Sequence, residues 1–210
     1  MASADIELIA HLMRRAGFGA TYEELEQFAA NGYDATVDEL LSPMEQPDLE
    51  MDLLERYFID WKEMNALEVN QAYLTYRMIN TKRPLQEKMT LFWHGIFCVG
   101  NSKCEHGAQI QTQLNMFREK GMSSFPELLL ALSVDPAMVF YLDNCMSHKD
   151  AINENFGREL LELFAMGVGM DGEANYSEED VKECARAFTG WTIANAIPRY
   201  PYGRFPSMFA

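Results

Sequence analysis

The chain has 210 residues, of which 48% are hydrophobic and 23% are charged, and this composition is typical of a globular protein with one sizeable core. Its 32 acidic and 17 basic residues give a formal net charge of −15. Because no local basic patch offsets this charge, the phosphate backbone of a nucleic acid would be repelled, and we expect no nucleic-acid partner.

The chain shows no sign of a membrane span or of export. Its longest apolar stretches are residues 89–99 and 128–142, and neither reaches the roughly 20 apolar residues that a span needs. The N-terminus lacks the basic start, apolar run and cleavage site of a secretory signal. We expect a soluble, cytoplasmic protein as the sequence is written, or a periplasmic or secreted one if the natural protein carries a signal peptide.

The cysteines indicate neither a metal site nor a disulfide framework. Cys98, Cys104, Cys145 and Cys184 form no C-x-x-C pair and no zinc-type spacing. A chain of this length does not need disulfides to hold a core. We therefore predict reduced, mostly buried thiols.

Helix-start signals recur along the chain. Thr21, Ser124 and Ser177 are each followed three residues later by an acidic residue, and Asp135 precedes a proline. Leu, Met, Ala and Glu dominate between these signals, and no run alternates clearly enough to predict a strand. We predict helices near residues 5–16, 21–31, 34–41, 50–80, 85–98, 107–120, 125–133, 136–144, 152–166 and 178–193.

The remaining segments are predicted to be irregular. Residues 42–48 form an acidic surface loop, residues 167–175 a glycine-rich turn, and residues 198–210 an aromatic tail. This tail is too apolar for a solvated terminus, so we expect residues 198–210 to open a further structured segment. We predict an all-α, irregular multi-helix domain, with residues 1–210 forming either a single domain or the N-terminal part of a longer one.

Several stretches together resemble a bacterial family catalogued as domain of unknown function 1800. They are His11 to Gly19, Gln86 to Gly95, Gln113 to Arg118, Asp135 to Asp143, Asn153 to Phe164, and Asn175 to Trp191. The resemblance implies that family members continue well past the last of these stretches. It also implies frequent export and a partner among sulfatase-like proteins of domain of unknown function 1501, but no established activity.

The chain departs from the family pattern at two positions. Ile96 stands where a second histidine is common, two residues after His94, and Gly157 stands where alanine is usual. The first departure argues against a two-histidine ligand set.

On the predicted helix 85–98, one arc is apolar and the opposite one polar. At 100° per residue, Met89, Phe92 and Ile96 gather on one side, while His94 and Glu87 share the other. This polar side is either solvated or helix-contacting, which is the commoner case, or it contributes a ligand or catalytic pair.

The predicted helix 152–166 supplies the carboxylates that such a pair needs. Glu159 falls at the edge of the apolar arc that includes Ile152 and Leu163, so it should be partly buried and need a partner. That partner is either an arginine, with Arg14, Arg15, Arg118 and Arg186 as candidates, or a metal or substrate. Asn155 and Glu162 lie beside Glu159, and Arg158 pairs outward with Glu154.

Gln113 lies on the apolar side of the predicted helix 107–120, where its amide must find hydrogen-bond partners. We therefore expect an internal polar cluster from residues 85–98, 107–118 and 153–162. No G-x-S-x-G, Walker, G-x-G-x-x-G, H-E-x-x-H or E-x-x-H signature is present.

Two functions are consistent with these observations. The first is an enzyme, a metal-assisted hydrolase or a related enzyme, with Glu159, Glu162 and His94 as catalytic groups or ligands of a divalent metal. In that case Asn155, Arg158, Gln113 and Glu87 would bind or orient. The second is a non-catalytic binding or assembly partner of a neighbouring sulfatase-like enzyme, in which the polar cluster only holds the helices in register.

Overall fold

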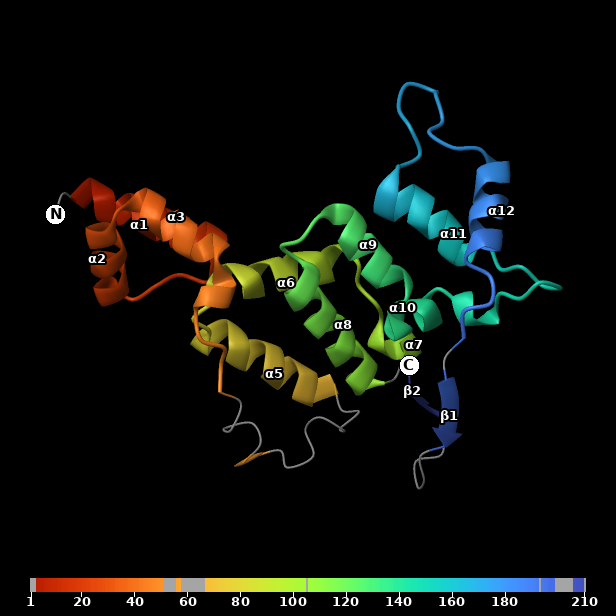
Figure 1. Cartoon of the computed structure of the whole chain (residues 1–210), viewed down its shortest axis with the longest axis horizontal. Helices are drawn as coiled ribbons and strands as arrows, with labels where there is room; N and C mark the ends of the chain where they lie inside the picture. The colour runs from red at the N-terminus through yellow and green to blue at the C-terminus, as the bar shows by residue number, and fades with distance from the viewer. Residues whose placement is uncertain are drawn as a thin grey trace. The chain divides into compact units, whose positions relative to one another are not determined.

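The computed structural model describes residues 3–50, 56–57, 67–104, 106–192, 194–198 and 206–209. Helices dominate these residues, which confirms the predicted all-α class (Figure 1). The chain divides into two compact units, Met1–Ile96 with Phe117–Met122, and Phe97–Met116 with Ser123–Ala210. This division does not test whether the chain is one domain or part of a longer one, so that statement stays a prediction.

The first unit packs its N-terminal helices around a small apolar core. Its elements are α1 (Ser3–Ala16), α2 (Tyr22–Asn31), α3 (Tyr33–Leu41), the 3-10 turn η1 (Pro43–Glu45), α5 (Leu67–Asn80), α6 (Pro84–Ile96) and the end of α8 (Gly107–Lys120). Ile9, Met13 and Leu40 are buried in this core, and Phe28 packs against them. Residues 51–55 and 58–66 of the predicted helix 50–80 lie outside the described residues.

The second unit contains most of the remaining helices. They are α7 (Asn101–Cys104), the first part of α8, α9 (Phe125–Ser133), α10 (Pro136–Tyr141), the 3-10 turn η2 (Asn144–Met146), α11 (Asn155–Glu159), η3 (Leu160–Ala165) and α12 (Glu178–Ala187). The segment η3 is a π-helix that continues directly from α11. Two pairs of phenylalanine rings pack edge to face. The ring centroids are 5.2 Å apart for Phe97 and Phe164, and 5.1 Å apart for Phe156 and Phe188.

The C-terminal region differs from its prediction. Helix α12 ends at Ala187 instead of residue 193, and Gly190 then takes a φ of +98°, a left-handed conformation that glycine adopts readily. An antiparallel pair of strands follows, β1 (Ala194–Pro198) and β2 (Pro206–Phe209), where no strand was predicted. Residues 193, 199–205 and 210 of this region lie outside the described residues.

The helix-start signals are confirmed. The Thr21 hydroxyl accepts a hydrogen bond from the Glu24 backbone at 3.3 Å, and the Glu24 carboxylate accepts one from the Thr21 backbone at 2.8 Å. Ser177 and Asp180 form the same reciprocal pair at the start of α12. Asp135 caps α10 by accepting from the Met138 backbone at 2.8 Å. These caps fix where the helices begin.

All four cysteines are free, as predicted, but they are not mostly buried. Cys104 is buried, Cys145 and Cys184 are half-buried, and Cys98 is exposed.

Candidate functional site

Glu87 on α6 lies at the centre of a buried ion cluster in the first unit. Its side chain is fully buried and accepts a hydrogen bond on Oε1 from Arg77 Nε at 2.8 Å. Arg118 makes a bidentate contact with the same carboxylate: Nε donates to Oε1 at 2.9 Å and Nη2 donates to Oε2 at 3.0 Å. Two guanidinium groups therefore compensate the charge of Glu87.

The two arginines extend this network outward. Arg118 also donates to the Tyr73 hydroxyl at 3.0 Å, and Arg77 donates to Asp48 at 2.7 Å. Partial burial opposes ionisation of Asp48, but the hydrogen bond and charge of Arg77 outweigh it and lower the pKa of that carboxyl. We call these five residues the Glu87 cluster.

The Glu87 cluster overturns the expected orientation of α6. This helix buries Gln86, Glu87 and Thr90, whereas Phe92 and Ile96 of its predicted inner arc are 52% and 44% exposed. Three charged hydrogen bonds to Glu87 outweigh the cost of leaving these apolar side chains in water. Arg118 is among the arginines expected to bind a buried carboxylate, but the carboxylate is Glu87 and not Glu159.

His94 lies later on α6 and is half-buried. Its Nδ1 atom is buried, and it has no hydrogen-bond partner among the described residues. Burial lowers the pKa of the imidazole, which favours the neutral form that can bind a metal or accept a proton.

In the second unit, Asn155 and Arg158 connect α11 to neighbouring segments through hydrogen bonds and ion pairs. The Asn155 amide donates to the Leu142 carbonyl at 3.1 Å. Arg158 makes a two-pronged contact with Glu178, 2.9 Å for each bond, besides its predicted pair with Glu154 at 3.3 Å. These contacts join α11 to α12 and to the preceding loop.

Glu159 and Glu162 are half-buried, as expected for Glu159. Glu162 accepts from the Tyr176 hydroxyl at 3.5 Å, and Glu159 has no hydrogen-bond or ion-pair partner among the described residues. The predicted arc fails at Leu163, which is 65% exposed, and at Ile152, which is 43% exposed. The π-helix explains Leu163, because its wider i→i+5 winding rotates the residues beyond Glu159 away from their α-helical positions.

Gln113 belongs to a buried polar pair, as expected. It is fully buried and donates to Asp135 Oδ2 at 2.8 Å, the same oxygen that caps α10. Burial raises the pKa of Asp135 to about 6 although these hydrogen bonds favour its ionised form.

The predicted metal site is not assembled within either unit. Among the described residues, no three His, Cys, Asp or Glu side chains are grouped so that they could hold a metal ion. His94 and Glu87 belong to the first unit, and Glu159, Glu162, Asn155, Arg158 and Gln113 to the second. A joint site of His94 with Glu159 and Glu162 therefore stays a prediction.

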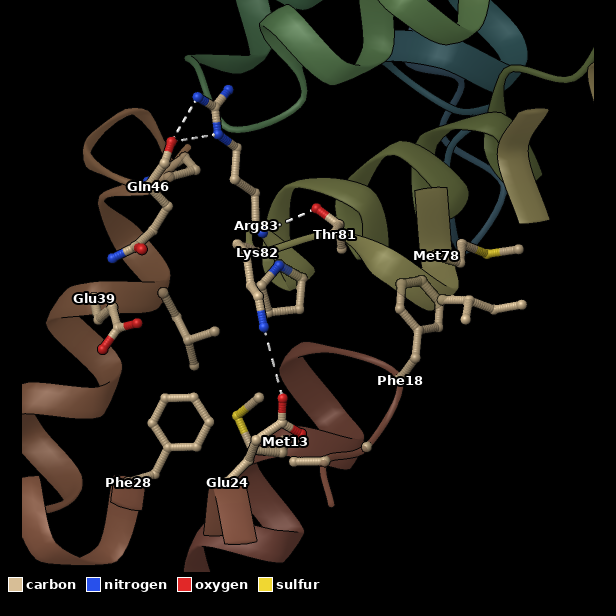
Figure 2. A pocket seen from close by; sticks show the side chains of 16 residues that line it. Met13, Phe18, Glu24, Phe28, Glu39, Gln46, Met78, Thr81, Lys82 and Arg83 are labelled. Carbon is tan, nitrogen blue, oxygen red and sulfur yellow. Dashed lines mark hydrogen bonds and ion pairs between the residues drawn. The ribbon is translucent and has the colours of Figure 1, made fainter. Parts of the chain in front are cut away.

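The first unit also contains a pocket that was not predicted from the sequence (Figure 2). It has a volume of about 150 Å³ and is bounded by the α1–α2 turn, α2, α3, the η1 segment and the α5–α6 turn. Met13, Phe28 and Leu40 of the apolar core line it. We call it the α1–α3 pocket.

The charged side chains around the α1–α3 pocket are mostly paired. Lys82 reaches toward Glu24 on α2, with 3.9 Å between nitrogen and oxygen, while Arg83 turns toward the Gln46 carbonyl and donates to it at 2.9 and 2.6 Å (Figure 2). Glu39 on α3 is different, because it is half-buried and its carboxylate forms no hydrogen bond or ion pair among the described residues. The pocket therefore combines apolar and polar walls with one uncompensated carboxylate.

A second, wider hollow shares residues with this pocket. Phe18, Glu24, Met78 and Ile79 line both, and Thr21 and Thr75 extend the second one. The pocket was missed because its walls come from segments far apart in the sequence. The one residue that could have indicated the pocket from the sequence is Glu39, a charged residue on the same helix as the buried Thr36 and Leu40.

Comparison with known proteins identifies a family but no function. A family model described as a protein of unknown function (DUF1800) matches residues 11–207. No curated protein and no solved structure matches the chain. Within the described residues, no helix combines the length and apolar character required to cross a membrane. Because the match covers nearly the whole chain, the protein belongs to the DUF1800 family.

Proposed function

We propose that this protein is a non-catalytic binding protein whose α1–α3 pocket receives a small apolar group that carries a positive charge. The observation that carries this proposal is the uncompensated, half-buried Glu39 carboxylate in a pocket that Met13, Phe28 and Leu40 also line. No described side chain binds the Glu39 carboxylate, so a cationic ligand would form a charge-assisted hydrogen bond with it.

The dimensions of the pocket limit the apolar group. A volume of about 150 Å³ is comparable to an apolar cavity that accommodates benzene, so one group of about six carbons would fill it. A longer ligand would continue over the adjoining hollow lined by Thr21, Thr75 and Ile79. Free amines and the lysine or arginine side chains of a partner protein both match this description.

The other charges support a cation over an anion. Lys82 is paired with Glu24. Arg83 donates a hydrogen bond to the Gln46 carbonyl and lies 4.0 Å from the Asp48 carboxylate. Because both cations already have partners, the carboxylate of a ligand would have to compete for them. The net charge of −15 also attracts cations to the protein as a whole.

The test compares three probes of equal length, n-hexylamine, n-hexanol and n-hexanoate, by calorimetric or NMR titration. We expect hexylamine to bind best, and Glu39→Gln to weaken its binding about 10- to 100-fold, because a charge-assisted hydrogen bond is lost. Glu45→Gln is the matched control, since Glu45 is exposed and does not line the pocket. Equal binding of all three probes, or equal effects of the two variants, would overturn the proposal.

The biological partner in this proposal is the sulfatase-like protein that the family resemblance implies. A lysine or arginine side chain of that protein would occupy the α1–α3 pocket. Co-purification of the two proteins that is lost in Glu39→Gln but kept in Glu45→Gln would support this partner, and equal recovery with both variants would count against it.

A metal-assisted hydrolase is the second candidate function. It rests on His94, whose buried Nδ1 atom has no hydrogen-bond partner among the described residues and whose pKa is lowered. In this candidate, Glu159 and Glu162 remain the carboxylates expected from the sequence, with Asn155 and Arg158 to orient them. Elemental analysis of the protein purified without chelator tests this candidate: stoichiometric metal that is lost in both His94→Ala and Glu159→Ala supports it, and no metal in any of the three proteins contradicts it.

A further inference from the structure

A second surface, in the other unit, exposes large apolar side chains close together in sequence. Leu163 and Met166 at the end of η3 are 65% and 48% exposed, and Val168 and Met170 in the following turn are 61% and 82% exposed. We call these four residues the 163–170 surface. Isolated exposed apolar residues are common, but four within eight positions form a feature that needs an explanation.

The backbone holds this surface in a defined shape. The Asn175 amide donates to the carbonyls of Met166 and Gly167 at 2.7 and 3.1 Å, and the Gly167 backbone donates to Leu161 at 3.0 Å. Gly169 has a φ of +101°, and a Cβ there would clash with the Glu173 carbonyl oxygen, so only glycine fits. The turn therefore presents Val168 and Met170 from a fixed backbone.

The segment that carries this surface has only negative charges. Residues 159–175 contain Glu159, Glu162, Asp171 and Glu173, and no lysine, arginine or histidine. Among the described residues none of these four carboxylates forms an ion pair. A second copy of the chain would bring like charges together, and an anionic membrane would be repelled.

We propose that the 163–170 surface binds an amphipathic helix of a partner protein, with apolar residues on one face and lysine or arginine at its edges. The apolar face would cover Leu163, Met166, Val168 and Met170, and the basic residues would meet the surrounding carboxylates. Two of the four anchors are methionines, whose flexible side chains adapt to different apolar partners. This surface is separate from the α1–α3 pocket and does not depend on the function proposed for it.

The test uses a fluorescent 18-residue peptide of leucine and lysine arranged with helical periodicity, and a scrambled peptide of the same composition. We expect the amphipathic peptide to bind and the scrambled one to bind much more weakly, as followed by fluorescence anisotropy. The double variant Val168→Ser, Met170→Ser should weaken binding about tenfold or more, because the buried apolar area is lost. Asp171→Asn with Glu173→Gln should weaken binding less and reduce its dependence on salt.

Leu130→Ser is the matched control, because Leu130 is 69% exposed on α9 and lies outside the surface. Circular dichroism establishes that each variant keeps its helical content. Equal binding of the scrambled peptide, or equal loss in Leu130→Ser and in the double variant, would overturn the proposal. So would a dimer in sedimentation experiments that the double variant dissociates, since the occupant would then be a second copy of this chain.

Discussion

Replacing Glu87 by glutamine tests the Glu87 cluster most directly. The substitution keeps the size of the side chain but removes the charge that two guanidinium groups share. Glutamine offers one oxygen in place of two, and its amide hydrogens face Arg118 Nη2, so at least one of the three hydrogen bonds is lost. Arg77 and Arg118 are only 4% and 8% exposed, so water cannot replace the lost carboxylate.

We expect Glu87→Gln to lower the free energy of unfolding by about 3–5 kcal/mol, the usual cost of removing one partner from a buried ion pair. With a urea dependence of about 2 kcal/mol per molar, the unfolding midpoint would fall by about 1.5–2.5 M. The loss should be nearly the same at low and high salt, because buried charges are poorly screened.

The assay is urea unfolding followed by circular dichroism, with Glu183→Gln as the control. Glu183 pairs with Arg186 on the exposed side of α12, so its loss should cost less than about 1 kcal/mol. A midpoint for Glu87→Gln within about 0.5 M of the control would refute the reasoning, because the cluster would then contribute little.

Three further changes have expected outcomes. Because the pKa of Asp135 is raised to about 6, the folded protein binds a proton between about pH 4 and 6 that the unfolded chain releases, and stability falls as pH rises through this window. Asp135→Asn keeps an oxygen that can accept the hydrogen bonds from Gln113 and from the Met138 backbone, because both bonds end on the same Asp135 oxygen. In thermal unfolding, this variant should therefore be up to about 3 kcal/mol more stable than the parent protein at pH 7.5, with no gain at pH 4. Gly157→Ala should destabilise the protein by about 1–3 kcal/mol in urea unfolding, because the added Cβ would lie 2.8 Å from the Ala185 nitrogen; a gain in stability, as helix propensity alone predicts, would contradict this. Ser177→Ala should remove a capping bond to Asp180 and cost about 1 kcal/mol, seen as faster amide hydrogen exchange in the first turn of α12; unchanged exchange there would contradict the cap.

The helix boundaries could be predicted from sequence wherever the signal is local. A hydroxyl or carboxylate at an N-cap acts on backbone groups two or three residues away, so Thr21, Asp135 and Ser177 marked helix starts correctly. The strands β1 and β2 were missed because their pairing joins segments whose local composition does not alternate.

The orientation of the helices could not be predicted in the same way. Helical periodicity assumes that the apolar side faces inward, and α6 violates this because Glu87 binds arginines from α5 and α8. The sequence contains no local sign that Arg77 and Arg118 meet there. At Leu163 the error has another cause, since a projection at 100° per residue does not apply to a π-helix.

The order in which the Glu87 cluster is synthesised has a consequence for folding on the ribosome. Glu87 and Arg77 belong to the first 96 residues of the chain, but Arg118 follows Glu87 by 31 positions. At a translation rate of about 5–20 residues per second, Glu87 emerges about 2–6 s before its second arginine. During that interval the Glu87 carboxylate lacks the positive charge of Arg118, which it binds in the folded protein. The first unit therefore completes its folding only after the chain has entered the second, and a fragment that stops at Ile96 would leave Glu87 without the bidentate bond of Arg118.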